Sequence, residues 1–156
     1  MKPSLKQYAD YFCMGLELEI CSRTELIAWA DDLIELSDQP KDWMIELATS
    51  QKQHILDVFH LLRSIPGKAN LDISFKLLLA KLMKEYPTVA LEDIRILRKL
   101  YSFTDFEISY NFKACLYKID SELDWLDSLD DDNWPVVQRD YENLLALGAD
   151  YKDWVD

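Results

Sequence analysis

The sequence predicts an all-α fold, and three observations carry this prediction. The chain of 156 residues has only 3 Gly and 5 Pro, which fall between stretches of helical spacing. Apolar side chains recur every three to four residues, the period of a helix with one buried face. The alternation of apolar and polar residues that marks a half-buried strand is missing. We therefore expect seven or eight helices, with antiparallel pairs packed as a bundle or a short solenoid.

Length and composition favour a single domain covering residues 1–156. Hydrophobic residues make up 49% of the chain, which is enough material for one core. No apolar run approaches the ~18–20 residues of a membrane-spanning helix, and the N-terminus lacks the apolar stretch of a signal peptide. Cys13, Cys21 and Cys115 are odd in number and match no paired metal-ligand spacing. We therefore expect reduced thiols in a cytoplasmic protein that does not contact membranes.

Local signals divide the first half of the chain into four helices. Ser22 and Glu25 form a capping-box pattern, in which each side chain can satisfy the other residue's free backbone N–H. Pro40 suits the first turn of the third helix, where its missing N–H does no harm. The expected helices are about 5–20, 22–36, 40–47 and 51–64, and the last of them stops at Pro66-Gly67.

Four further helices are expected in the second half. Asn70 or Asp72 starts the fifth, and the sixth carries basic residues in its last turn, in agreement with the helix dipole. Thr104 and Glu107 form a second capping box for the seventh. The expected ranges are about 70–86, 89–101, 104–129 and 133–147; Asn133 and Pro135 start the last one, and Gly148 is its expected C′ residue.

Charge is distributed unevenly along the chain. The net charge is −12, and residues 120–156 alone carry 12 acidic and 2 basic side chains. This balance disfavours nucleic acid and anionic membranes as partners, because long-range repulsion opposes their approach. The same stretch contains Trp125 and Trp134, whereas acidic disordered tails are usually poor in aromatic residues. We therefore expect a folded segment that suits a basic partner.

Metal sites are not favoured by the available ligands. His54, Asp57 and His60 share one predicted helix, but the two histidines lie ~120° apart around it, so one metal ion could hardly bind both. A calcium loop starting at Asp120 would place Trp125 where the loop needs Gly. We therefore expect no metal and no cofactor.

Enzyme signatures are also missing. With 3 Gly in total, the chain cannot build a P-loop or a Gly-rich dinucleotide turn, and it has no GxSxG elbow. We therefore do not expect an enzyme, although His54, Asp57 or a carboxylate cluster would be the residues of a catalytic alternative. In a further alternative, the acidic array imitates the phosphates of a nucleic acid.

The seventh helix has two distinct faces at ~100° per residue. Its core stripe consists of Phe112, Leu116, Ile119, Leu123 and Leu126. An acidic stripe centred about 90° away is bordered by tyrosines. Acidic residues without compensating bases cost stability on a helix, whereas aromatic and acidic residues together suit an interface with a basic protein. The predicted partner-binding residues are Tyr110, Tyr117, Asp120, Asp124, Trp125, Asp127, Asp131 and Trp134.

The chain resembles the small, acidic, all-α immunity proteins of bacterial polymorphic-toxin and contact-dependent-inhibition systems. The resemblance rests on overall character and on the stretch GLELEICSRTELIAWADDLIELSDQPKDWMIELA, Gly15 to Ala48, about a fifth of the chain. It implies a cytoplasmic protein that binds one toxin, often a basic nuclease, and blocks its active site. The resemblance assigns no binding residue, because such families vary most at their toxin-contacting surfaces.

The expected function is therefore an immunity protein that binds and neutralises a cognate, basic bacterial toxin domain. The alternative is a helical adaptor or regulatory module that binds another protein. The solvated face of an ordinary amphipathic helix would also explain the acidic stripe. The sequence leaves the toxin's identity and the oligomeric state open.

Overall fold

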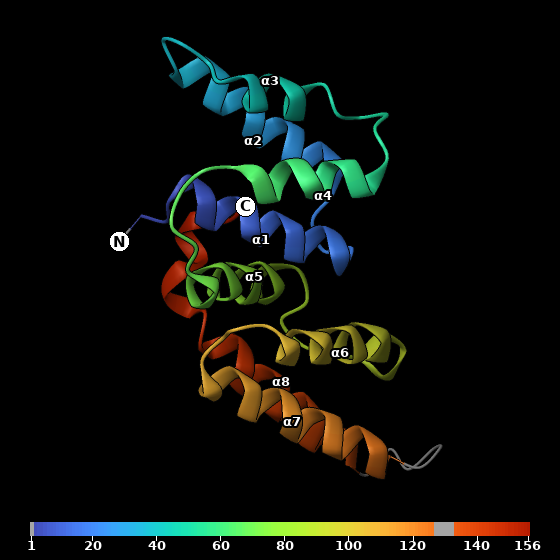
Figure 1. The fold of residues 1–156 in the computed structure, drawn as a ribbon. Helices are drawn as coiled ribbons and strands as arrows, with labels where there is room; N and C mark the ends of the chain where they lie inside the picture. Colours follow the sequence, from blue (N-terminus) through green and yellow to red (C-terminus); the bar gives the residue numbers. More distant parts are fainter. Residues whose placement is uncertain (1, 127–132) are drawn as a thin grey trace. The chain divides into compact units, whose positions relative to one another are not determined.

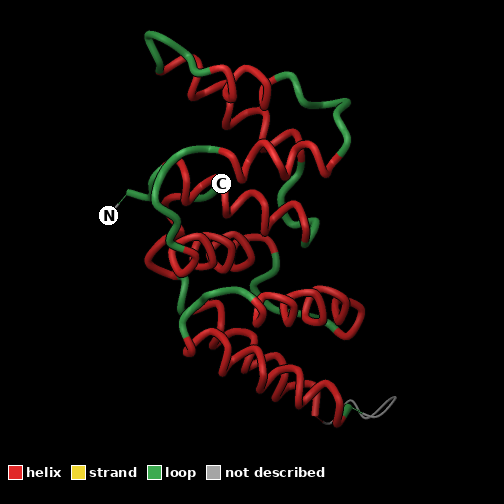
Figure 2. Tube along the Cα trace, in the orientation of Figure 1, coloured by secondary structure: helices red, strands yellow, loops and turns green. Residues whose placement is uncertain are grey.

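The computed structural model describes residues 2–126 and 133–156, and every regular element in these ranges is helical (Figure 1, Figure 2). The predicted all-α class is therefore confirmed. The α-helices are α1 (Leu5–Glu17), α2 (Arg23–Leu36), α3 (Asp42–Ala48), α4 (Ile55–Ser64), α5 (Leu71–Glu85), α6 (Ile94–Tyr101), α7 (Tyr110–Trp125) and α8 (Trp134–Ala146). Short 3₁₀ helices are η1 (Leu91–Asp93), η2 (Ser102–Asp105) and η4 (Ala149–Trp154).

The helices group into two compact units, residues 3–69 and residues 70–156. We call them unit 1 and unit 2. In unit 1, α2 packs beside α3 and α1 packs beside α4; in unit 2, α8 returns alongside α7 (Figure 1). These neighbours agree with the predicted antiparallel pairs. A single domain covering 1–156 stays a prediction, because the structure defines the packing inside each unit.

Aromatic rings join three helices of unit 1. The Trp29 ring of α2 lies 5.1 Å from the Phe12 ring of α1, measured between centroids. The Trp43 ring of α3 lies 6.3 Å from the Trp29 ring. Tilted pairs at these distances add attraction between ring edges and faces to the burial of apolar surface. Through Trp29, these ring contacts connect α2 to both α1 and α3.

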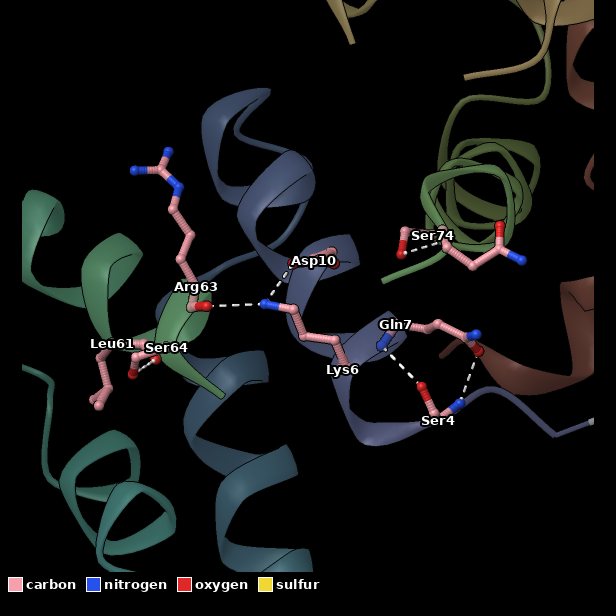
Figure 3. Close-up of polar contacts among 9 residues, drawn as sticks. Ser4, Lys6, Gln7, Asp10, Leu61, Arg63, Ser64 and Ser74 are labelled. Atoms are coloured by element: carbon pink, nitrogen blue, oxygen red, sulfur yellow. Dashed lines mark hydrogen bonds and ion pairs between the residues drawn. The ribbon is translucent and has the colours of Figure 1, made fainter. Parts of the chain in front are cut away.

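Polar contacts hold the start of α1 and link it to α4 (Figure 3). Ser4 and Gln7 form a capping box, in which Gln7 N donates to Ser4 Oγ and Ser4 N donates to Gln7 Oε1. Lys6 Nζ donates to the carbonyl oxygen of Arg63, the residue before the last of α4, at 2.9 Å (Figure 3). Lys6 also pairs with Asp10 at 3.3 Å. One lysine thus caps the end of α4 and ties it to α1.

The fourth helix starts later than predicted because Arg23 holds the residues before it. The Arg23 guanidinium donates to the carbonyl oxygens of Ser50, Gln51 and Gln53. These carbonyls belong to the connection between α3 and α4, which the sequence pattern had assigned partly to the helix. The helix then begins at Ile55, where His54 Nδ1 accepts from Leu56 N at 3.2 Å.

The core of unit 2 surrounds α5, which packs against α8 and η4. Phe75 of α5 makes edge contacts with Phe103 at 5.7 Å and Phe112 at 5.1 Å between ring centroids. Lys81, also buried on α5, pairs with Glu85 at 2.8 Å and donates to Asp156 O at 2.9 Å. These partners compensate for the cost of burying an ammonium group.

The predicted start of the seventh helix at Thr104 is wrong. Thr104 lies in η2, where its hydroxyl donates to Tyr101 O at 2.8 Å, and Phe106 is extended. Phe103 and Ile108 are both buried. In one continuous helix their side chains would point about 140° apart, so they would not share a single buried face. The helix α7 begins at Tyr110 and ends at Trp125. Leu129, the predicted end, lies outside the described residues.

Candidate functional site

The start of α7 is fixed by a residue of α5. Ser109 is the N-cap, and its backbone N–H donates to Asp72 Oδ1 at 2.7 Å. The Ser109 hydroxyl donates to the other oxygen of the same carboxylate. A carboxylate at a helix N-terminus satisfies free N–H groups and interacts favourably with the helix dipole. Asp72 therefore determines where α7 begins and so where Tyr110 lies.

The buried face of α7 is the predicted one. Phe112, Leu116, Ile119 and Leu123 are all buried, and Leu126 is partly buried after the helix end. This row packs α7 against α8 and α6. Its burial fixes the rotation of the helix and therefore decides which side chains point to solvent.

The exposed side of α7 carries a row of tyrosines. Tyr110 is 74% exposed and Tyr117, two turns later, is 44% exposed. The two residues lie about 20° apart around the helix and roughly 10 Å apart along it. Tyr101 of α6 is 37% exposed and makes an edge contact with Tyr117, with 6.0 Å between ring centroids. We call Tyr101, Tyr110 and Tyr117 the tyrosine row.

The acidic part of the predicted surface is only partly described. Asp124 is exposed and Asp120 is half-buried on the same side of α7 as the tyrosines. Lys113, seven residues before Asp120, lies on that side too and was not considered in the sequence prediction. The charge along the described part of this face is therefore mixed. Asp127, Asp131 and the Trp125 side chain lie outside the described residues.

Trp134 belongs to the core of unit 2 rather than to an exposed surface. Its side chain is buried, and its indole N–H donates to Val89 O at 3.1 Å. Trp134 was predicted at the partner-binding surface because it is adjacent to the acidic run in the chain. Helical spacing places Trp134 on the buried face of α8, together with Val137 and Tyr141.

A carboxyl cluster that the sequence pattern did not predict lies between α7 and α8. Asp140 of α8 is 4% exposed, and its Oδ1 lies 3.3 Å from Lys118 Nζ of α7. Burial, a hydrogen bond with Asp140 and the charge of Asp140 raise the pKa of Glu122 to about 7. The sequence contained one indication of this cluster. Helical spacing places Asp140 on the same side of α8 as the apolar residues Val137, Tyr141 and Leu144.

Burial sets the ionisation of two of the three cysteines, and one of the two histidines caps a helix. Burial raises the pKa of the Cys13 thiol to about 12, and burial followed by the charge of Asp140 raises the pKa of Cys115. Both thiols are therefore neutral and poorly nucleophilic near neutral pH. His54 caps α4, and His60 is exposed. Among residues 2–126 and 133–156, no group of three or more His, Cys, Asp or Glu could hold a metal ion.

Comparison with protein-family models, with characterised proteins and with solved structures gave no match. None of the helices in the described part of the chain has the length and apolar character needed to cross a membrane. The geometry of the tyrosine row and of the carboxyl cluster is therefore the basis for a functional proposal.

Proposed function

We propose that this chain is an immunity protein that binds and neutralises a basic bacterial toxin domain through the exposed face of α7. The observation that carries the proposal is the tyrosine row, with Asp124 exposed beside it. The described residues of unit 2 leave most of Tyr110 uncovered, and this exposure is large for an aromatic side chain. An intermolecular contact would remove this apolar surface from water.

Tyrosines are suited to serve as the anchors of such a contact. A tyrosine offers a large apolar ring and a hydroxyl, and ordering it costs little conformational entropy because it has two side-chain torsions. Binding energy concentrates on a few such residues near the centre of an interface. The edge contact between Tyr101 and Tyr117 restricts both rings before any partner arrives, which lowers the cost further.

Charge favours a basic partner. The chain carries a net charge of −12, so its field attracts a positively charged domain over a distance of about a Debye length. Asp120 and Asp124 on the tyrosine face can then pair with basic side chains at the rim of the contact. The toxin as partner is supported by the acidic, all-helical character of the chain and by the resemblance of residues 15–48.

The proposal is tested by binding the purified chain to the product of the neighbouring gene. The double variant Tyr110→Ala/Tyr117→Ala should weaken binding about 30-fold or more, in the range expected when two interface anchors are removed. Asp124→Lys should weaken binding at low salt and have a smaller effect at high salt. Isothermal titration calorimetry at both salt concentrations gives the affinities.

Asp31→Lys is the matched control, because Asp31 is also an exposed helical aspartate but lies on α2 of unit 1. It should leave the affinity nearly unchanged. If Asp31→Lys weakens binding and the α7 variants do not, the proposed surface is wrong even if the partner is right. A neighbouring gene product that binds but has no toxic activity would replace the immunity role with that of an adaptor.

A further inference from the structure

Two buried carboxyl oxygens of unit 2, one on α7 and one on α8, lack a hydrogen-bond donor while both carboxyls are ionised. Glu122 Oε2 of α7 and Asp140 Oδ2 of α8 are shielded from solvent, and while both carboxyls are ionised neither oxygen accepts a hydrogen bond from the described residues. The carboxyl of Asp140 lies within hydrogen-bonding reach of the Glu122 carboxyl. A buried oxygen without a donor loses its hydration and gains nothing in return. Because both oxygens lie at the interface of α7 and α8, one hydrogen bond between the two carboxyls could satisfy both.

The charges around the pair do not balance if both carboxyls are ionised. From α7, the Lys118 ammonium lies 3.3 Å from Asp140 Oδ1, but its side chain is largely exposed, so water screens its charge. From α8, Arg139 is exposed and favours the ionised form of Glu122 only as a minor contribution. Cys115 faces Asp140, and burial keeps its thiol neutral. Among described residues, α6 and η2 add no charged group that acts on Glu122.

We propose that Glu122 and Asp140 share one proton and that this proton locks α7 to α8. With Glu122 protonated, its O–H donates to Asp140 Oδ2, so both solvent-shielded oxygens gain a partner. Asp140 stays ionised and keeps its ion pair with Lys118. When the proton passes to water, the pair holds a second negative charge and loses the hydrogen bond. The packing of α7 on α8 then weakens. The lock is independent of any toxin partner.

The direction of the pH effect follows from the pKa of Glu122. Burial, the hydrogen bond with Asp140 and the charge of Asp140 raise this pKa from 4.5 to about 7, so the folded chain holds a proton that the unfolded chain releases. The contribution of this proton to the free energy of unfolding is complete below pH 4.5. It falls as the pH rises from 4.5 to about 7, and it is lost at higher pH. One proton changes the folding equilibrium constant by at most about tenfold per pH unit in this window.

The first test is urea unfolding of the full chain between pH 5 and about pH 8, a range chosen to span the window above. Glu122→Gln keeps an N–H donor toward Asp140 at every pH, so its folding constant should lose the decline that the unaltered chain shows. Glu142→Gln is the matched control, because Glu142 is an exposed glutamate on α8. It should decline as the unaltered chain does. Parallel pH profiles for all three proteins would overturn the lock.

The second test does not depend on how well a variant folds. Carboxyl carbon NMR of the folded, unaltered chain, labelled at Glu and Asp, should show one glutamate that titrates near pH 7 and disappears in Glu122→Gln. Asp140→Asn removes the neighbouring negative charge, so the titration of Glu122 should move toward lower pH. If every glutamate titrates below pH 5, the carboxyls do not share a proton.

Discussion

At the scale of single residues, Gly148 shows how a missing side chain permits close packing in unit 2. The sequence predicted it as a C′ glycine, for which a positive φ is the usual reason. Its φ is −103°, which any residue can adopt. A Cβ at this position would lie 2.6 Å from Lys76 O and 2.7 Å from Leu79 Cβ. Glycine is needed because the chain passes close to the backbone of α5.

Gly148→Ala should therefore destabilise the protein through crowding rather than through backbone strain. We expect the free energy of unfolding to fall by about 1–3 kcal/mol, since the nearest atom belongs to a helix backbone that cannot easily move. Chemical denaturation measures the change. Asn143→Ala, at an exposed position of α8, is the control and should stay within about 0.5 kcal/mol of the unaltered chain. An equally small effect of Gly148→Ala would show that α5 can shift to make room.

At the scale of elements, the start of α7 depends on a long-range contact. Asp72 and Ser109 are 37 residues apart, yet the carboxylate accepts from both the backbone and the hydroxyl of Ser109. The alternative start, the capping box of Thr104 and Glu107, is a purely local pattern. The chain turns between η2 and α7, and Phe103 and Ile108 are both buried on either side of this turn.

Asp72→Ala should loosen the first turn of α7. Removing a side-chain cap typically costs about 1 kcal/mol, and here two donors of Ser109 lose their acceptor. Amide hydrogen exchange should become faster at residues 109–113, with a smaller change in the last turns of α7. The control is Asp105→Ala, an exposed aspartate in η2. Unchanged exchange at residues 109–113 would mean that the buried face alone holds this turn.

The contrast between local and long-range signals explains what the sequence could predict at this scale. Ser22 caps α2, Asn70 caps α5 and a proline lies in the first turn of α8, as the sequence indicated, because each signal lies next to the helix that it starts. The buried row of α7 was also correct, since helical spacing alone decides it. The true starts of α4 and α7 depend on contacts with Arg23 and Asp72, which no local pattern contains.

The candidate site also combines features that local helical spacing predicts with features that depend on long-range contacts. The exposure of Tyr110, Tyr117 and Asp124 could be predicted from their angle around one helix. The pairing of Glu122 with Asp140 could not, because it requires knowing which faces of α7 and α8 meet. Sequence proximity to the acidic run was misleading for Trp134, whose helix turns it inward.

At the scale of the whole molecule, negative charge is a property of both units. Unit 1 has 11 acidic and 6 basic side chains, and unit 2 has 18 acidic and 10 basic ones. In the proposed complex, a field that arises from the entire chain would guide the basic partner before any contact forms. The exposed tyrosines of the proposed surface would act only after contact, when water leaves their rings. Association and dissociation should therefore depend on different groups.

Salt should separate these two contributions. Raising the ionic strength from about 20 to about 300 mM should slow association with the basic partner at least tenfold, because ions screen the field of the chain. The dissociation rate should change much less, and Tyr110→Ala should increase it at both salt concentrations. Surface plasmon resonance gives both rates. An association rate that is independent of salt would exclude a strongly basic partner.

The aromatic packing of unit 1 has a practical consequence for spectroscopy. Trp29 and Trp43, whose rings lie 6.3 Å apart, are the tryptophans of unit 1, and Trp125, Trp134 and Trp154 belong to unit 2. Replacing the first two by phenylalanine would leave indole fluorescence that reports on residues 70–156 alone. Replacing the other three would leave an emission that reports on the α1–α3 ring contacts. The chain thus carries two optical reporters, by which the melting of each half can be followed without a dye.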